Sequence, residues 1–290
     1  MVIISDTFGQ LGNRLFLFAH FIANAKEFDY RVCYPGFQEY AHYFTGTRNS
    51  LVCQYPAGEP SPVKRIRIKK YINSFLTLLA TNYARTTIRL PHLTVLSLTE
   101  REGEGDYDLG GGEYKELRET TPFLIAQGWL FRDERNFHKH ADTVRHYFSP
   151  ARPFSRNISS LISSARNDCD LLVGIHIRQG DYEFWQDGRY YYKTAEYVNI
   201  LRDTVELWPG KRVRYLICSN EKQDTRLFNG LNCTGGTGEQ LEDMYAFAAC
   251  DYLIGPPSTY TMWASFYGSV PLFVINDLHE PITLEGFTVC

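Results

Sequence analysis

The chain has no long run of apolar residues, and this absence limits the kinds of protein that it can be. Of its 290 residues, 44% are hydrophobic and 22% are charged, which is the composition of a folded globular protein. No stretch approaches the roughly 20 apolar residues that a membrane-spanning helix needs. The chain opens on a strand-like segment at residues 2–5, so we expect no signal peptide before it.

Cysteine pairs of the CxxC type are also absent. The seven cysteines are an odd number and are scattered, a pattern that favours reduced thiols, a cytoplasmic location and no zinc site. Two Asp-x-Asp triplets remain as metal candidates. The one at 168–170 precedes a predicted strand, at the wrong end of its sheet, and the one at 106–108 lies in a polar, glycine-rich loop at 103–112. We therefore expect no metal and no cofactor.

Positive charge is not in excess. The 33 Asp and Glu outnumber the 30 Lys and Arg, and the formal net charge of −3 argues against nucleic acid as a partner. Basic residues gather only at 64–70, at the cationic start of a segment that becomes apolar towards Leu79. We favour a helix packed on its own domain; the alternative is weak peripheral contact with an anionic membrane. Liposome flotation without nucleotide distinguishes the two.

Strand-like and helix-like segments alternate along the chain. In the first half, a strand, glycine loop, helix and short strand fill residues 2–34, and a strand at 123–130 precedes a helix at 134–148. The segment 149–153 is the best candidate for a domain boundary. In the second half, strands at 171–177, 213–218, 252–254 and 270–275 alternate with helices at 190–207, 239–249 and 258–267. This α/β pattern predicts two Rossmann-like, doubly wound domains, 1–150 and 151–290, facing a cleft.

The first glycine loop runs from Gly9 to Asn13 and is not a G-x-G-x-x-G fingerprint. Gly9 and Gly12 still allow the backbone to approach a ligand closely, and Asn13 stands at the helix start, where free amides collect. The alternative is a tight turn that needs two glycines.

The strand at 171–177 is the most informative segment. It is apolar and stopped by Gly180, which is typical of a central parallel strand. Because side chains alternate, His176 and Arg178 share one side at its carboxyl end, which borders the ligand crevice in open α/β sheets. An imidazole and a guanidinium there indicate an anion site. The alternative is an Arg178–Asp181 ion pair that only fixes a turn, and spacing alone does not decide between them.

A second polar site follows the strand that ends at Ile254. Ser258 stands at the N-cap of the next helix, and the amides of Ser258 and Thr259 are placed to hold a phosphate. If this strand neighbours the one at 171–177, these amides and Arg178 converge on one anion. The alternative is an ordinary capped helix. The glycine-rich segment 235–238 lacks the rest of a phosphate-loop motif, so we interpret it as a flexible loop.

Four separated stretches together resemble the successive motifs of the α-1,2-fucosyltransferase family. They are GQLGNRLFLFA at 9–19, GWLFRDERNF at 128–137, HIRQGDY at 176–182 and EDMY at 242–245 leading on to STYTMW at 258–263. Their order and rough spacing match over most of the chain. The chain departs from the family's pattern at Gln179, where a second arginine is usual, and at 256–257, where two prolines replace small polar residues.

The resemblance implies a GT-B arrangement, with an acceptor-side domain at 1–150 and a nucleotide-sugar-binding domain at 151–290. It implies GDP-fucose as donor, inversion at the anomeric carbon, no metal, and an acceptor glycan whose expected reacting group is O2 of a terminal galactose. In the wider fucosyltransferase group, the arginine of the His-x-Arg stretch serves the donor's diphosphate, and this role carries over to Arg178.

On this basis we assign a role to each candidate residue. Arg178 and the amides of Ser258 and Thr259 bind the diphosphate, and His176 binds donor hydroxyls or phosphate. Guanine is read by Ser219, Asn220 and Asp243. The acceptor meets the donor at Gly9, Gly12 and Asn13, and the candidate bases are Asp181, Glu183 and Asp6. A transferase for another sugar nucleotide, or a weakly active GDP-binding protein, would share the architecture. A donor panel separates the first alternative, and calorimetry with GDP separates the second.

Overall fold

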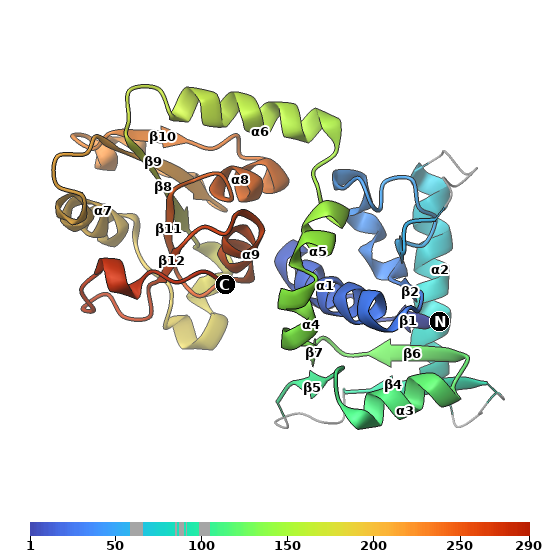
Figure 1. The fold of residues 1–290 in the computed structure, drawn as a ribbon. Helices are drawn as coiled ribbons and strands as arrows, with labels where there is room; N and C mark the ends of the chain where they lie inside the picture. Colours follow the sequence, from blue (N-terminus) through green and yellow to red (C-terminus); the bar gives the residue numbers. More distant parts are fainter. Residues whose placement is uncertain (59–65, 85, 87–89, 91, 99–104) are drawn as a thin grey trace. The chain divides into compact units, whose positions relative to one another are not determined.

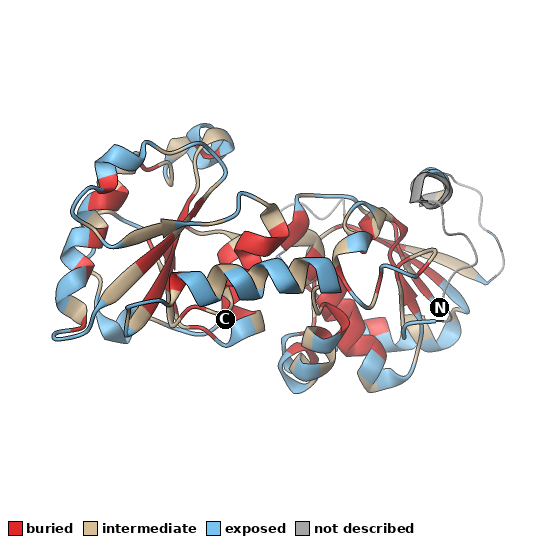
Figure 2. Ribbon diagram, turned by 90° about the horizontal axis from the view of Figure 1, so that it is seen from above, coloured by how far each residue is buried: buried red, intermediate tan, exposed pale blue. Residues whose placement is uncertain are grey.

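In the computed structural model, the chain divides into two units, Met1–Ala151 and Arg152–Cys290 (Figure 1). The described residues are 1–58, 66–84, 86, 90, 92–98 and 105–290. Parts of two segments that the sequence singles out, the proline-rich 56–62 and the basic 64–70, therefore lie outside them. Each unit has a five-stranded sheet of its own, and buried residues line the strands of both sheets (Figure 2).

The sheet of the second unit has the strand order β10-β9-β8-β11-β12, and all of its neighbouring strands are parallel. From β8 the chain adds β9 and β10 on one side, then crosses to add β11 and β12 on the other side of β8. The direction in which strands are added therefore reverses between β8 and β11. In open α/β sheets the ligand crevice lies at such a reversal, outside the carboxyl ends of the strands. The strands are β8 (Leu171–Ile177), β9 (Val213–Ser219), β10 (Cys233–Gly235), β11 (Tyr252–Gly255) and β12 (Leu272–Val274).

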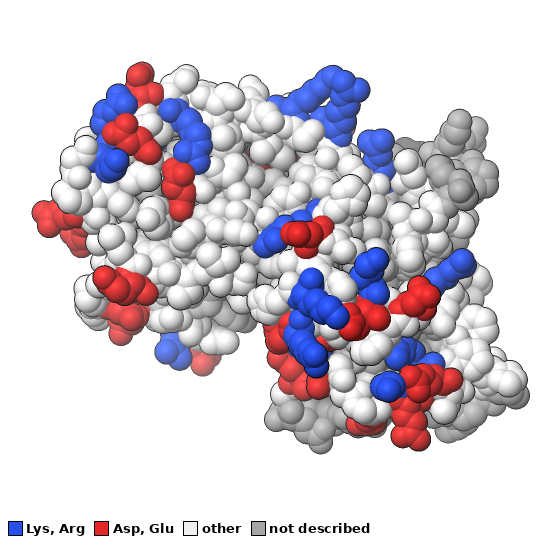
Figure 3. Space-filling view, in the orientation of Figure 1, with Lys and Arg blue, Asp and Glu red and all other residues white. Residues whose placement is uncertain are grey.

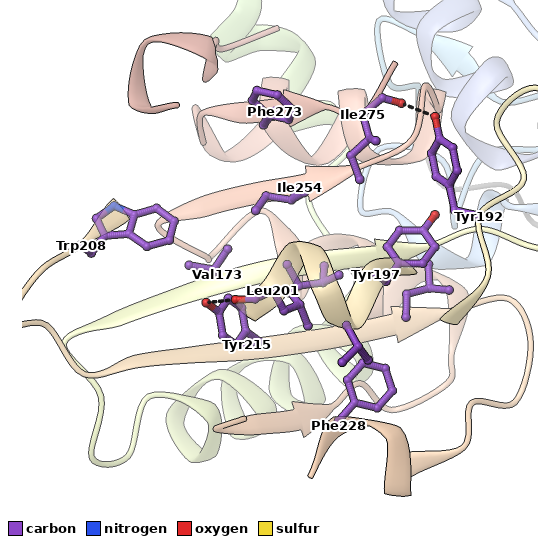
Figure 4. Close-up of a cluster of buried hydrophobic side chains, with 13 residues drawn as sticks. Val173, Tyr192, Tyr197, Leu201, Trp208, Tyr215, Phe228, Ile254, Phe273 and Ile275 are labelled. Carbon is purple, nitrogen blue, oxygen red and sulfur yellow. Dashed lines mark hydrogen bonds between the residues drawn. The ribbon is translucent and has the colours of Figure 1, made fainter. Parts of the chain in front are cut away.

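Helices cover both faces of this sheet. The apolar residues Val173, Ile175 and Ile177 of β8 pack with Tyr197 and Leu201 of α7 in one buried cluster (Figure 4). Full burial of each aliphatic side chain contributes about 1.5–3 kcal/mol, and this fixes β8 and the residues that follow it. The helices are α6 (Arg152–Ala165), α7 (Thr194–Thr204), α8 (Gln240–Phe247) and α9 (Thr259–Gly268), with 3-10 turns η3 (Gly180–Glu183), η4 (Trp185–Gly188), η5 (Val205–Leu207), η6 (Thr225–Phe228) and η7 (Leu284–Gly286).

On the opposite face, β8 approaches α8 closely at Gly174. A Cβ added there would lie 2.6 Å from atoms of Phe247 and Leu253, so only glycine fits. His176 belongs to this face as well, with its ring against Phe247 and Tyr260. The predicted alternation, with the aliphatic residues of β8 on one side and His176 on the other, is confirmed.

The sheet of the first unit has the order β3-β2-β1-β6-β4, in which only β3 is antiparallel to its neighbour. Its direction reverses between β1 and β6. The strands are β1 (Val2–Ile4), β2 (Val32–Cys33), β3 (Gln54–Tyr55), β4 (Leu93–Ser97) and β6 (Phe123–Gln127), and a separate pair joins β5 (Tyr107–Asp108) to β7 (Phe131–Arg132). The helices are α1 (Leu11–Phe28), α2 (Ile66–Ala84), α3 (Gly112–Thr120), α4 (Glu134–Lys139) and α5 (Ala141–Tyr147), with η1 (Pro35–Glu39) and η2 (Ala41–Tyr43).

Three predictions for this unit are wrong in detail. The strand expected at 123–130 is broken at Gly128, whose φ of 126° interrupts extended backbone. The helix expected at 134–148 is two helices that meet at His140, whose ring lies 2.7 Å from the Glu27 carboxylate on α1. The described part of the loop expected at 103–112 contains β5, because Tyr107 is buried against Phe131.

Within the described residues no helix combines the length and the apolar character needed to cross a membrane. The described part of α2 exposes Tyr71, Phe75 and Leu78, and weak peripheral membrane contact by this helix stays the untested alternative to a helix packed on its own domain. Acidic and basic side chains are interspersed on the face of each unit that Figure 3 shows.

Candidate functional site

Arg178 directly follows β8, at the carboxyl edge of the second sheet. Its Nη2 donates to Asp181 Oδ2 over 2.7 Å, so the ion pair considered as an alternative exists. The Asp181 side chain is 55% exposed, and such exposed pairs contribute about 1 kcal/mol or less. The Nε of Arg178 is buried, and no described residue forms a hydrogen bond with it. The guanidinium therefore keeps donors that an oxygen-rich anion could use.

Tyr182 joins the end of β8 to the turn after β11. The Arg178 guanidinium carbon lies 5.4 Å from the centre of its ring, and its hydroxyl donates to the Pro257 carbonyl over 2.5 Å. Burial raises the pKa of this phenol, so it remains a hydrogen-bond donor. No sequence pattern predicted a role for Tyr182. The available signal was its position at the end of the HIRQGDY stretch, four residues beyond Arg178.

The turn after β11 leads into α9. Ser258 is the N-cap, and its Oγ accepts a hydrogen bond from the Tyr260 amide over 3.2 Å. The remaining amides of the first helical turn, including that of Thr259, have no acceptor within the helix, and the helix dipole makes this end attractive to anions. Strands β8 and β11 are parallel neighbours. Arg178 and the start of α9 therefore lie at one edge of the sheet, at its topological reversal.

His176 lies beneath this edge and is only 4% exposed. Its ring centre is 4.9 Å from that of Tyr260, and its Nδ1 is buried without a hydrogen-bond partner in the described part of the chain. Burial, with a smaller contribution from Arg178, lowers its pKa to about 3, so the imidazole is neutral near pH 7. That His176 touches donor hydroxyls or phosphate stays a prediction; in the structure its ring packs against that of Tyr260.

The lowered pKa of His176 predicts acid sensitivity. In the unfolded chain the imidazole takes up a proton below pH 6.5, whereas in the folded protein it stays neutral down to about pH 3. Stability is therefore lost as the pH falls through this window, by about 1 kcal/mol at pH 5.5. A His176→Gln variant lacks this loss, so we expect its thermal midpoint to fall less than that of the wild type between pH 7.5 and 5.5.

The matched control is His138→Gln, on an exposed residue of α4, which should behave like the wild type. Equal falls in the wild type and in His176→Gln would contradict the assignment of a buried neutral imidazole.

A cavity of about 460 Å³ opens beyond the carboxyl ends of β9 and β10, and Ser219, Glu221 and Asp243 are among its lining residues. Asp243 is 5% exposed. Its carboxylate accepts hydrogen bonds from the amides of Thr237 (2.6 Å) and Gly238 (3.1 Å), and burial raises its pKa. The segment 235–238, expected to be a flexible loop, is thus held by Asp243. The structure brings two of the three predicted guanine-reading residues to this one cavity.

Asn220, the third of these residues, has a different contact. Its Oδ1 accepts from the Gln179 amide over 2.8 Å, and its Nδ2 donates to the Gln179 carbonyl over 3.0 Å. Asn220 therefore fastens the loop after β8 to the loop after β9. The Gln179 side chain donates to the Tyr192 carbonyl over 3.0 Å. Gln179 occupies the position at which the α-1,2-fucosyltransferase family usually has a second arginine, and here it helps to connect these loops.

In the first unit, the Gly9–Asn13 turn connects β1 to α1. Gly9 has a φ of 70°, and a Cβ added to it would lie 2.1 Å from Asn13 Nδ2, so the turn requires glycine. Asp6 Oδ1 accepts from the Phe8 amide over 2.6 Å. Phe8 is 49% exposed and stacks on Trp129, 4.8 Å between ring centres, where the first sheet reverses. That Gly9, Gly12 and Asn13 lie where acceptor meets donor stays a prediction.

The three candidate bases have different surroundings. Asp181 pairs with Arg178, Asp6 holds the turn after β1, and Glu183 is exposed. In the described part of the chain, no group of three or more His, Cys, Asp or Glu is arranged to hold a metal ion. The triplet at 168–170 lies before β8, where Asp170 pairs with Arg212 over 3.1 Å.

No protein-family model matches the sequence, and no curated protein matches it. Solved structures do match the fold. One is the crystal structure of NodZ α-1,6-fucosyltransferase soaked with GDP-fucose; it is 16% identical, with a TM-score of 0.57, and the match covers 99% of this chain and 96% of that one. A structure of fucosyltransferase NodZ from Bradyrhizobium also matches.

Two further structures are similar. A mutant of FUT1 from Arabidopsis thaliana in complex with GDP has a TM-score of 0.58 at 15% identity, covering 94% of this chain and 69% of that one. POFUT1 in complex with GDP-fucose has a TM-score of 0.54 at 11% identity, covering 93% of each chain. At these identities the likeness establishes a shared α/β fold with parallel sheets.

Proposed function

We propose that this protein is a fucosyltransferase that uses GDP-fucose as its donor, with its two units in a GT-B arrangement across a cleft. The observation that carries the proposal is the edge of the second sheet, where Arg178, Tyr182 and the start of α9 meet at the reversal between β8 and β11. The structural relatives that bind GDP or GDP-fucose support the choice of nucleotide.

The chemistry of this edge suits a diphosphate leaving group. As the bond from fucose to the diphosphate breaks, negative charge grows on the phosphate oxygens. The Arg178 guanidinium and the amides of Ser258 and Thr259 stabilise that charge by directed hydrogen bonds. In our proposal no metal takes part, so these donors supply the stabilisation. Tyr182 positions Arg178, because the guanidinium lies over the Tyr182 ring and the Tyr182 hydroxyl is hydrogen-bonded to the Pro257 carbonyl.

The cavity at β9 and β10 is the proposed guanine site. The edge of guanine presents N–H donors, and a carboxylate is the acceptor that suits them. Asp243 and Glu221 both line the cavity, whose volume falls within the range of small-molecule sites. Uracil presents a different edge, so UDP should bind far more weakly than GDP.

The acceptor reaction follows from the same proposal. A base removes the proton of the acceptor hydroxyl as that oxygen attacks the anomeric carbon from the face opposite the diphosphate, with inversion. Asp181, Glu183 and Asp6 remain candidates for this base. We propose O2 of a terminal galactose as the attacking group, and a cytoplasmic location.

A thermal-shift comparison tests the donor assignment. A ligand that binds only the folded protein at 100 times its Kd stabilises it by about 2.7 kcal/mol. We expect GDP and GDP-fucose to raise the unfolding midpoint clearly and UDP to have little effect. Stabilisation by UDP alone would instead favour another sugar nucleotide, and no response to any of the three would contradict the proposed function.

A further inference from the structure

A second polar cavity lies wholly within the first unit. It has a volume of about 470 Å³ and lies between α2 and the segment that follows β2. Thr7, just beyond β1, and Pro35, just beyond β2, contribute to its wall, so the cavity is at the carboxyl edge of the first sheet. Its polar lining comes mainly from Arg14, Gln38, Glu39, Ser74, Thr77 and Thr81.

Three hydroxyl side chains of α2 line this cavity together. Ser74, Thr77 and Thr81 are spaced at i, i+3 and i+7, which places them on one face of the helix. The Oγ1 of Thr77 is buried and has no hydrogen-bond partner among the residues that the structure describes. A buried hydroxyl without a partner is unfavourable, and a threonine in a helix has two accessible χ1 rotamers. Thr77 can therefore turn its hydroxyl to a ligand that enters the cavity.

Among the described residues that line the cavity, Arg14 is the one cation, and it is already neutralised. Arg14 donates to the carbonyls of Thr7 (2.8 Å), Gly9 (3.1 Å) and Gly36 (3.0 Å), and it pairs with Glu39 over 3.2 Å. These bonds occupy most of its five N–H donors, so Arg14 builds the wall and is not available to a phosphate. The Gln38 side chain accepts from the Cys53 thiol. Among the described lining residues, a ligand then meets the hydroxyls of α2 and the accepting oxygens of Glu39, which is 61% exposed.

We infer that this cavity binds a neutral pyranose unit of the acceptor glycan. A sugar ring offers hydroxyls that both donate and accept, which matches the Ser74, Thr77 and Thr81 side chains. Pro35 and Leu78 line the same cavity and supply apolar contact for the C–H face of the ring. The volume falls within the range of small-ligand sites. The inference rests on the proposed function for the name of the ligand, as the acceptor.

The test is a Thr77→Val variant, which replaces the buried hydroxyl by a methyl group of similar size. Binding is measured by saturation-transfer NMR with three probes: methyl β-galactopyranoside, methyl β-glucopyranoside and N-acetylglucosamine. We expect at least one to bind the wild type, and its Kd to rise about 3- to 10-fold in the variant. The thermal midpoint should not fall, because the variant removes an unpaired buried polar group.

Two controls separate this result from a general effect. Thr120→Val changes an exposed threonine of α3 whose hydroxyl bonds only to its own helix in the described structure, and should leave sugar binding unchanged. Ser74→Ala, at an exposed residue of α2, repeats the test if Thr77→Val folds poorly. No saturation transfer from any probe to the wild type, or equal affinity in both cavity variants, would overturn the inference.

The thermal shift with GDP distinguishes the two proposals. If a sugar binds the wild type through Thr77 but GDP does not raise the unfolding midpoint, the proposed function is contradicted and the cavity assignment stands. A thermal shift with GDP, without binding of any sugar, would overturn the cavity assignment and leave the proposed function in place.

Discussion

Replacing Arg178 with alanine is expected to lower the rate of GDP release from GDP-fucose by about 100- to 1,000-fold, the usual cost of losing one fixed donor to a developing negative charge. The fold should survive, because Arg178 lies just beyond the last residue of β8 and, in the described part of the chain, its ion pair is with the exposed Asp181. Circular dichroism and the thermal midpoint check the fold, and initial rates at saturating donor measure the effect.

A lysine at position 178 should fail almost as badly, since a point charge cannot reproduce the planar fork of donors. Arg226→Ala is the matched control, because Arg226 belongs to the same unit and forms an exposed pair with Asp224. It should keep wild-type turnover. Full activity in a well-folded Arg178→Ala variant would remove this residue from the mechanism.

Replacing Asp243 with asparagine is expected to weaken GDP binding by about 10- to 100-fold. The carboxylate accepts from the amides of Thr237 and Gly238, and a side-chain amide would turn an N–H group towards one of these donors. A lost hydrogen bond to a charged group costs about 1.5–3 kcal/mol. The cavity wall at 235–238 would then shift, and the proposed acceptor for guanine would be gone. Titration calorimetry with GDP measures the change in Kd.

Asp224→Asn is the control for this variant, since Asp224 is in the same unit and outside the residues that line the cavity. Its GDP affinity should equal that of the wild type. If Asp243→Asn also binds GDP normally, guanine is not read in the cavity at β9 and β10.

The central strand shows how far sequence patterns reach. An apolar run stopped by Gly180 was enough to predict β8, its buried faces and the position of Arg178 at the carboxyl end, because these follow from local periodicity. Two of the strands that were missed, β3 and β10, have only two and three residues. A segment that short has no period to detect, and only its pairing with a neighbour makes it a strand.

The contacts that organise the site could not be read from spacing. Tyr182 meets Pro257, 75 residues further along the chain, and Asn220 meets Gln179, 41 residues earlier. Nothing in the local sequence of Asn220 distinguishes a residue that fastens two loops from one that contacts a base. The Arg178–Asp181 pair was foreseen as a competing interpretation; the structure contains it together with the buried, unpaired Nε.

The most direct test of the account is turnover of GDP-fucose followed by NMR, with lactose or water as acceptor, in the presence and absence of EDTA. We predict that GDP is released at the same rate with and without EDTA, that transferred fucose has an inverted anomeric carbon, and that Arg178→Ala lowers the rate by about 100- to 1,000-fold. GDP-fucose that remains intact with the wild-type protein, or release that requires a divalent metal, would contradict the account.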